Sequence, residues 1–351
     1  MVTGVYLQTQ SRKSIPDRNS VMNLRVLILS GLVAVSAGVA GWLQSHSDRT
    51  TREASAEHEL QSELATAAKD IQRIKIETHE GVVFAAVKDT DRWIATHLDT
   101  IMTFPVDMKK LAKFANALNS LEVLEPKTSQ PEFYHRLGVE SVRDNDARSL
   151  LIEIGGEKEA FSLLVGRSAS GNRGTYVRQP EASTSLLVNK TLPLPEKRSD
   201  WLSREIFAFN SSDISAVDVE IEGQPLLTLN REGETADGWQ IAGYDEATAA
   251  LRYPTIVGQT VDKMLRFDFD GVKPFLQHKW SEVSLISQVI FSLEDGSEVM
   301  AYLSAPDPRG RFQLWIDTPD SPRWISEWVF ELSEYQARAF LPGLENLTSA
   351  I

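Results

Sequence analysis

The residue types that most often carry out chemistry are few in this sequence, and their spacing does not fit the sites they could form. The six histidines stand far apart, without the short intervals of a metal-binding motif. There is also no Cys to serve as a nucleophile, a thiolate ligand or a disulfide partner. We therefore expect surface histidines, no metal site and no cofactor. The histidines are His46, His58, His79, His97, His135 and His278.

Two short motifs share part of the pattern of a ligand-binding loop. The sequence "FDFDG" at Phe267–Gly271 alternates carboxylates as a calcium loop does, but it lacks the twelve-residue pattern and the terminal Glu of such a loop. The sequence "GNRGT" at Gly171–Thr175 is rich in Gly but has no Lys, which favours a turn over a phosphate loop. We interpret Asp268 and Asp270 as the solvent side of a short strand or turn.

Motifs of common enzyme classes are missing. The sequence contains no G-x-x-x-x-G-K-[ST], no G-x-S-x-G and no H-E-x-x-H. Paired carboxylates for acid–base catalysis cannot be singled out by spacing among 49 acidic residues. The sequence therefore predicts no catalytic, cofactor-binding or metal-binding residue, and a protein that is not an enzyme. An enzyme whose active site is not visible in a single sequence is the weakest of the alternatives.

The composition limits the class of protein. The chain has 351 residues, of which 42% are hydrophobic and 24% are charged, as in globular proteins with a sizeable core. Its formal net charge of −13 argues against a nucleic-acid-binding surface, which needs clustered Lys and Arg. We expect no nucleic-acid partner.

An apolar stretch near the N-terminus predicts a membrane anchor. The residues from Val26 to Leu43 are apolar or small, and a helix of this length spans roughly 27 Å, close to the thickness of a bilayer core. The basic residues before it place the N-terminus in the cytoplasm and the rest of the chain outside. We expect a cytoplasmic tail at residues 1–25, a transmembrane helix at 26–44, and a periplasmic body held at a bacterial inner membrane. The basic residues are Arg12, Lys13, Arg18 and Arg25.

A cleaved signal peptide is the alternative for this stretch. Residues Gly38–Ala40 would make an acceptable cleavage site, but the apolar run is longer than the 7–15 residues usual for a signal peptide. The anchor is therefore favoured. Met22 begins "MNLRVLIL", a more usual start for an anchor, so residues 1–21 are either an upstream start or a short tail.

The remainder of the chain predicts an α+β body of two tandem, strand-rich repeats. Residues 45–70 are polar, with Leu60 and Leu64 one helical turn apart, and predict a juxtamembrane stalk. Beyond them, "IKIE" at Ile74–Glu77 resembles "VDVE" at Val217–Glu220 at an offset of 143 positions. An offset of 146 aligns Trp93 with Trp239 and also aligns the apolar faces of two helices. The aligned helix positions are Leu111 with Val257, Ala115 with Val261, Leu118 with Met264, and Leu121 with Phe267.

Two predicted hairpins continue the repeat. "LLIEIGGEKEAFSLLVG" and "VIFSLEDGSEVMAYLSA" both alternate apolar and polar residues around a Gly-containing turn, at offsets of 139 and then 138. Tyr176 then aligns with Phe312 at an offset of 136. We place the repeats at residues 71–210 and 211–351, and expect both Trp93 and Trp239 in the core. We expect a closing helix within "SEWVFELSEYQARAFLPGL", ending at Pro342-Gly343.

Several phrases in this order resemble the domain-of-unknown-function 4340 family. They are "DIQRIKIE", "RWIA", "FPVD", "LNSL", "YHRLGV", "LLIEIG", "YVR" and "DWLSREIF", and they follow an anchor that starts near Met22. The likeness covers about residues 65–270. The family usually has Tyr-Gly-Leu where His135 and Arg136 here separate Tyr134 from Leu137. The resemblance implies an envelope protein with one N-terminal anchor. Some members of the family resemble the auxiliary component of gliding-motility-type ABC transporter systems. The resemblance carries no catalytic residues.

Two functional hypotheses follow. The first is a non-catalytic, membrane-anchored periplasmic accessory or scaffold protein whose partners are an ABC-type permease and its ATPase. The second is a binding module for a lipid, glycan or peptide at the junction of the two repeats, where a cleft would be expected. Edge strands of the predicted sheets offer a partner a place for β-augmentation.

Overall fold

The computed structural model describes residues 56–98, 102–156, 160–171, 173–231, 238–244, 249–318 and 323–350. The predicted tail, the predicted transmembrane helix and the first part of the predicted stalk lie outside these residues. Within them, no helix is both long and apolar enough to cross a membrane. The chain divides into two compact units, residues 1–58 and 59–351. The described part of the second unit is a mixed α+β fold dominated by strands, which confirms the predicted class.

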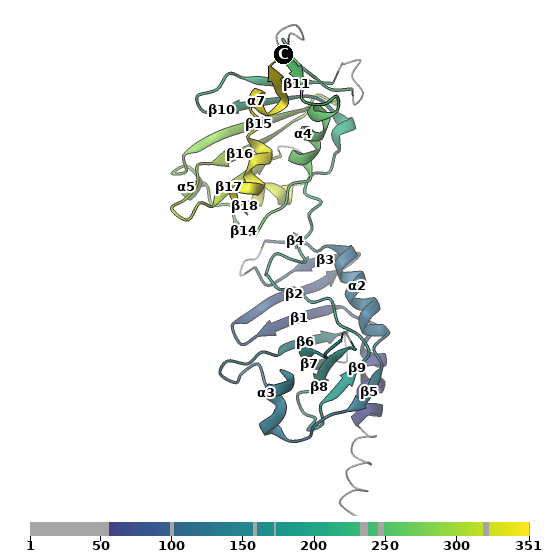
Figure 1. Cartoon of the computed structure of the whole chain (residues 1–351). Helices are drawn as coiled ribbons and strands as arrows, with labels where there is room; N and C mark the ends of the chain where they lie inside the picture. The colour runs from purple at the N-terminus through teal and green to yellow at the C-terminus, as the bar shows by residue number, and fades with distance from the viewer. Residues whose placement is uncertain are drawn as a thin grey trace, which may run out of the picture. The chain divides into compact units, whose positions relative to one another are not determined.

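The first sheet contains nine strands in the order β4-β3-β2-β1-β6-β7-β8-β9-β5 (Figure 1). Their bounds are β1 Arg73–Thr78, β2 Gly81–Asp89, β3 Arg92–Ala95, β4 Phe104–Pro105, β5 Val123–Pro126, β6 Leu150–Gly155, β7 Ala160–Ser168, β8 Thr175–Arg178 and β9 Leu186–Val188. Helices α2 (Met108–Asn119) and α3 (Tyr134–Leu137) accompany it, with a 3₁₀ turn at Pro131–Phe133. Alternate residues of β1 are buried, as expected when one face of a strand packs against a core.

Helix α2 forms as the apolar spacing predicts. Leu111, Phe114 and Leu118 are its buried residues, and they recur at intervals of three and four. Asp107 caps the N-terminus, where its side chain accepts hydrogen bonds from the backbone N–H groups of Lys109 and Lys110. This amphipathic helix packs its apolar stripe against the hydrophobic core.

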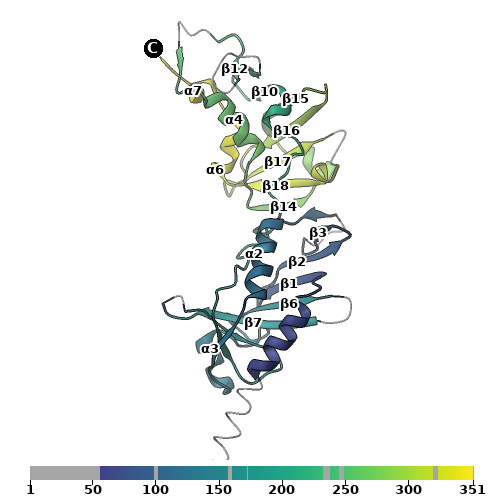
Figure 2. The same cartoon turned by 90° about the vertical axis from the view of Figure 1, so that its right-hand side faces the viewer.

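Part of the segment predicted as a stalk belongs to the folded body. Residues 56–67 are helical, and Leu60 and Leu64 are 1% and 5% exposed within the hydrophobic core. Figure 2 shows this helix, in purple, on the same side of the first sheet as α2. The two leucines, one turn apart, are therefore core residues.

The second sheet contains eight strands in the order β12-β11-β10-β15-β16-β17-β18-β14. Their bounds are β10 Ile214–Ile221, β11 Leu227–Asn230, β12 Gln240–Ile241, β14 Gly271–Pro274, β15 Leu285–Leu293, β16 Glu298–Ser304, β17 Phe312–Asp317 and β18 Trp328–Leu332. A separate pair joins β13 (Ala249–Leu251) to β19 (Thr348–Ala350). The helices are α4 (Ile256–Leu265), α5 (Gln277–Trp280), α6 (Glu334–Ala337) and α7 (Leu344–Leu347), with 3₁₀ turns at Ser211–Asp213, Arg323–Glu327 and Arg338–Phe340.

The two sheets share one strand order. When β10 is matched with β1 and the following strands in turn, β3-β2-β1-β6-β7-β8-β9-β5 corresponds to β12-β11-β10-β15-β16-β17-β18-β14. Helices α2 and α4 occupy the same place along the chain: α2 lies between β3 and β5, and α4 lies between their counterparts β12 and β14. Ala95 pairs with Ala86 in the first sheet, and Ile241 pairs with Leu229 in the second. Trp93 and Trp239 stand two residues before these positions; Trp239 is buried and Trp93 is half-buried.

The register corrects two of the predicted offsets. Ile154 lies opposite Ile74, and Phe291 lies opposite Val217, so the first strands of the two hairpins match at 137 positions instead of 139. A slip of two residues leaves every side chain on the same face, so alternation alone could not detect it. At β8 and β17 the matched inward residues are Val177 and Leu314, so Tyr176 does not correspond to Phe312.

The predicted closing helix is wrong over its first half. Trp328, Phe330 and Leu332 alternate and are all buried, so this stretch is strand β18. The helical part starts only after Ser333, which forms a capping box with Gln336. It ends as a 3₁₀ turn at Phe340.

Candidate functional site

The carboxylates of "FDFDG" lie in the short segment between α4 and β14. Phe267 and Phe269 are 4% and 1% exposed, and the extended backbone turns Asp268 and Asp270 to the opposite side. The Asp270 N–H donates to the carbonyl of Glu331 in β18, which fixes the segment to the edge of the second sheet. The two aspartates therefore have set positions, although the local pattern resembles a loop.

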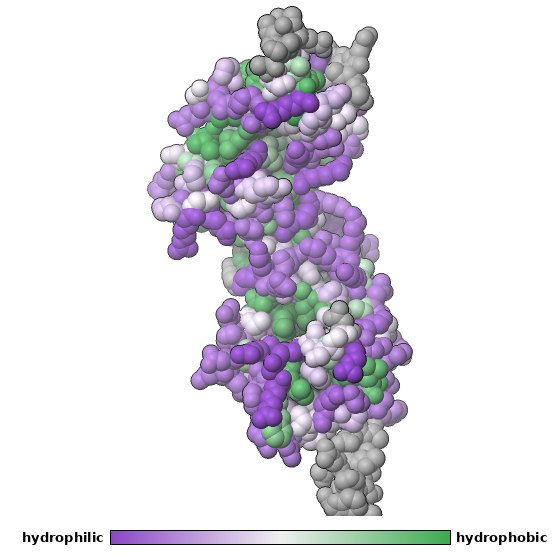
Figure 3. Space-filling view, viewed as in Figure 1, coloured by the Kyte–Doolittle hydropathy of each residue, from purple (hydrophilic) through white to green (hydrophobic). Residues whose placement is uncertain are grey.

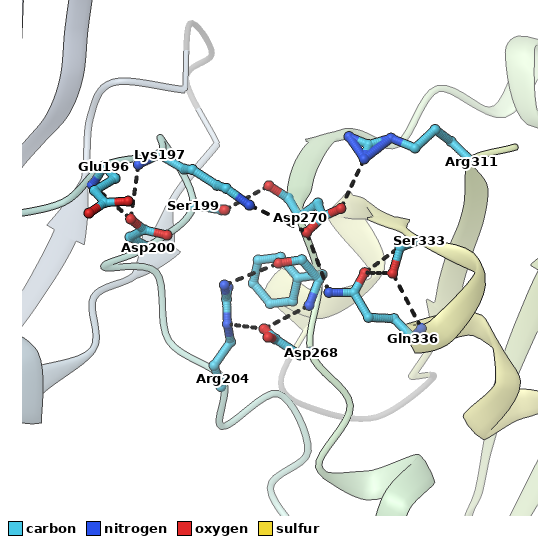
Figure 4. Close-up of polar contacts among 11 residues, drawn as sticks. Glu196, Lys197, Ser199, Asp200, Arg204, Asp268, Asp270, Arg311, Ser333 and Gln336 are labelled. Atoms are coloured by element: carbon cyan, nitrogen blue, oxygen red, sulfur yellow. Dashed lines mark hydrogen bonds and ion pairs between the residues drawn. The ribbon is translucent and has the colours of Figure 1, made fainter. Parts of the chain in front are cut away.

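Asp268 pairs with an arginine from the connector between the two sheets, residues 189–210. Its Oδ1 lies 2.7 Å from Nε of Arg204 and also accepts the Phe269 N–H at 2.9 Å (Figure 4). Nη2 of Arg204 donates to the carbonyl of Phe269 at 3.1 Å, and its guanidinium carbon stands 3.7 Å from the centroid of the Phe269 ring. Burial lowers the pKa of Arg204 and the charge of Asp268 opposes that shift, while a guanidinium stays charged in proteins.

Asp270 joins three further segments. Its Oδ2 accepts from Nη1 of Arg311 at 2.9 Å, and its Oδ1 lies 4.0 Å from Nζ of Lys197 and 3.5 Å from Nε2 of Gln336. Its backbone carbonyl accepts from Oγ of Ser199 at 2.7 Å. The side chain of Asp270 is only 26% exposed, whereas that of Asp268 is 66% exposed. The solvent-side interpretation therefore fits Asp268, but Asp270 belongs to a network.

This network holds the connector to the second sheet. Lys197, Ser199 and Arg204 come from the connector, and each contacts a group of residues 268–270. Each carboxylate already has a cationic partner, which lowers the negative charge available to attract a metal ion. Among the described residues, no group of three or more His, Asp or Glu side chains could hold a metal ion.

Next to the network, Phe104 of β4 is enclosed by aromatic rings. It is 0% exposed, and Nε1 of Trp328 donates to the carbonyl of the preceding Thr103 at 3.2 Å. Four rings meet that of Phe104 edge to face, a geometry that is favourable for aromatic pairs. The distances from the Phe104 ring centroid are 5.0 Å to Trp324, 5.4 Å to Trp328, 6.0 Å to Phe269 and 6.3 Å to Phe330.

One histidine departs from the surface position predicted for it. His97 is 4% exposed; its Nδ1 lies 3.1 Å from the carbonyl of Ala85 and its Nε2 lies 2.7 Å from that of Arg198. The signal was present in the sequence, because Trp93, Ala95 and His97 continue one alternating face beyond the end of β3. The other histidines of the described part are exposed, as predicted: His58, His79, His135 and His278.

The comparison with known families agrees with the predicted resemblance. Residues 93–273, more than half of the chain, match the model of a family described as a domain of unknown function (DUF4340). The chain belongs to this family. The match runs from β3 into β14, so it includes Phe104, the connector and both aspartates of the network. The comparison of this DUF4340 member with curated proteins found no match.

Proposed function

We propose that this DUF4340 member is a non-catalytic accessory protein of the bacterial envelope, anchored in the inner membrane by residues 26–44. Its periplasmic body consists of two tandem repeats, residues 71–210 and 211–351, and it binds an ABC-type permease and its ATPase. The observation that carries the proposal is the network at Asp268 and Asp270. These two aspartates come from the motif that most resembled a ligand-binding loop, but each pairs with an arginine, and they join the connector to the second sheet.

The shared strand order supports the tandem repeat. Two sheets with matched strands on one chain suit a protein that contacts more than one partner. The edge strands are short and offer little for strand addition, since β4 and β12 have two residues each and β14 has four. Strand β5 has four residues, an irregular register with β9, and Pro126, which has no N–H to donate. Side-chain surfaces are therefore the more suitable contacts.

A ligand module at the junction of the repeats is the alternative, and the packing there counts against it. Phe104, Phe269 and Trp328 are at most 1% exposed at the contact between β4 and the second sheet. Aromatic side chains thus fill the place where a junction ligand would need room.

The test is crosslinking in intact membranes followed by affinity recovery. The full chain is compared with a version that lacks residues 1–47 and is sent to the same compartment. Residues 1–47 fused to an unrelated periplasmic domain serve as the control. We expect a permease and an ATPase to be recovered with the full chain and not with the control fusion. Loss of both with the truncated chain would place the contact in the anchor. Recovery of neither with the full chain would refute the accessory role.

A further inference from the structure

The ends of the hairpins β1–β2 and β10–β11 are counterparts, and equal numbers of residues lie between their matched pairs. Ile76 pairs with Phe84 in the first sheet, and Val219 pairs with Leu227 in the second. Each pair encloses seven residues, "ETHEGVV" at 77–83 and "EIEGQPL" at 220–226. Counted from these pairs, Val83 corresponds to Leu226. The β1–β2 pairing continues to Thr78 and Gly81, whereas the β10–β11 pairing ends at Val219 and Leu227.

A hollow lies beside each of these turns. The first, of about 430 Å³, is lined by the β1–β2 turn and by residues 147–150, which lead into β6. The second, of about 460 Å³, is lined by the β10–β11 turn and by residues 285–288 at the start of β15. The register matches Ile152 with Val289, so the residues at the start of the two strands are also counterparts. The same place in both sheets is hollowed, although the side chains differ.

The chain itself supplies a third wall in the first hollow. Leu192, Leu194 and Pro195 of the connector line it; Leu192 is 5% exposed and Pro195 is buried. This stretch, Leu-Pro-Leu-Pro, has neither helix nor strand. Two prolines favour an extended backbone in such a segment. The first hollow thus shows what kind of chain fits against this part of the fold.

The second hollow has no such covering segment among the described residues, because its lining comes from the turn and β15 alone. After β18 the chain enters α6 instead of an extended connector. Leu226 and Leu285 are left 58% and 42% exposed. Figure 3 shows hydrophobic residues gathered over the strands labelled β10, β15 and β16 in Figure 1.

The charges around the second hollow indicate what should follow the apolar part of a ligand. Glu220 and Glu222 are exposed and line the hollow. In the first sheet, the connector continues from Pro195 to Glu196, Lys197 and Arg198, and Arg198 donates to the carbonyl of Val82 in the turn at 3.3 Å. Two carboxylates at the corresponding turn favour a basic group at that end.

We propose that the second hollow binds an extended segment of a partner protein, with leucine and proline side chains followed by basic residues. The segment would take the place that residues 192–195 occupy in the first sheet. This proposal rests on the accessory role proposed above and deepens it, because it names the chemistry of the partner segment. Leu226 and Leu285 would pack against its apolar side chains, and Glu220 and Glu222 would pair with its basic end.

The probe is a fluorescein-labelled peptide with the sequence of residues 191–198, Thr-Leu-Pro-Leu-Pro-Glu-Lys-Arg, added to the full chain in detergent solution. Fluorescence anisotropy should show saturable binding. Leu226→Asp should weaken it about tenfold, the order expected for loss of one leucine contact. Glu222→Lys should also weaken it, and more so at low salt. Leu344→Asp, at another exposed leucine outside the hollow, is the matched control and should leave binding unchanged.

Absence of saturable binding would overturn the proposal, as would equal binding by the Leu226→Asp variant with an unchanged far-UV circular dichroism spectrum. A peptide in which both leucines are replaced by serine tests the ligand side and should not bind. The two proposals fail separately. A permease recovered by crosslinking without peptide binding would leave the accessory role intact and remove this hollow as the contact. Peptide binding without a recovered permease would remove the accessory role and leave the hollow as a binding site for such a segment.

Discussion

The carboxylate of Asp307, in the turn between β16 and β17, shows how backbone hydrogen bonds and nearby charges set the acidity of an exposed residue. Its Oδ1 accepts the backbone N–H groups of Arg311 at 2.9 Å and Arg309 at 2.8 Å. The bond from Arg311, then that from Arg309 and the charges of both arginines, lower the pKa of Asp307. In the turn before β16, the side chain and then the backbone of Ser297 lower the pKa of Asp295 in the same way.

We expect the carboxyl carbons of Asp307 and Asp295 to titrate, by NMR, below the ordinary Asp midpoint of about 3.9. Both pKa values are lower in the folded chain than in the unfolded chain, so the ionised carboxylates stabilise the fold. Their contribution to the stability of the fold is present above the unfolded pKa and is lost as the pH falls through the folded pKa. Ser297→Ala should raise the midpoint of Asp295 and leave that of Asp307 unchanged. A midpoint of Asp307 at or above the ordinary value would show that the turn bonds do not persist in solution.

The sequence predicted these residue environments only in part. The motif "FDFDG" pointed to Asp268 and Asp270, but their partners Arg204 and Arg311 stand far along the chain. No local pattern connects such residues, so the sequence could not show that Asp270 is mostly shielded from solvent. The buried His97 was predictable, because it continues an alternating face that the sequence displays.

At the scale of elements, the N-terminus of α2 depends on one side chain. Asp107 accepts the N–H groups of Lys109 at 2.9 Å and Lys110 at 3.1 Å, whereas Thr255 at the start of α4 makes no such bond. Asp107→Ala should lower the free energy of unfolding by about 0.5–2 kcal/mol. Thr255→Ala, the matched change at the counterpart helix, should cost clearly less. Urea denaturation of both variants would measure the difference, and equal losses would contradict the capping role.

Local patterns predicted the type of an element better than its register. The spacing of Leu111 and Leu118 predicted helix α2, and the alternation of Ile152 and Ile154 predicted the β6–β7 hairpin; the structure confirms both. The stretch from Ser326 to Leu344 misled, because its apolar residues fit a helix and a strand equally well until burial is known. The predicted offset of 139 positions, two more than the observed 137, also came from an ambiguous pattern. Strand side chains alternate with a period of two, so a shift of two residues aligns the apolar residues equally well.

At the scale of the whole folded body, the contacts of Phe104 join elements that the sequence keeps apart. The hydrogen bond from Trp328 to Thr103 spans 225 positions, and the rings around Phe104 come from two separate segments, Phe269 and residues 324–330. The sequence predicted no element at Phe104, because β4 has only two residues and is too short to show an apolar–polar alternation. The corresponding positions of the first sheet are not aromatic: by register, Leu186 matches Phe330 and Thr184 matches Trp328. This set of ring contacts is therefore specific to the contact between β4 and the second sheet.

Phe104→Ala tests whether this contact makes the two sheets unfold together. Replacing a fully buried Phe by Ala should cost about 3–5 kcal/mol, because the enclosing rings cannot close the cavity. For the unaltered chain we expect urea transitions followed by Trp fluorescence and by far-UV circular dichroism to coincide. In the variant they should separate, because most tryptophans of the described part belong to the second half of the chain and weight the fluorescence toward it, while circular dichroism reports on both sheets. These are Trp239, Trp280, Trp315, Trp324 and Trp328, against Trp93 and Trp201 in the first half. Tyr335→Ala, at a side chain 84% exposed, is the control and should change neither curve. Transitions that still coincide in Phe104→Ala would assign the coupling to the charged network of Arg204, Asp268 and Asp270, and the double variant Phe104→Ala/Arg204→Met would then be expected to separate them.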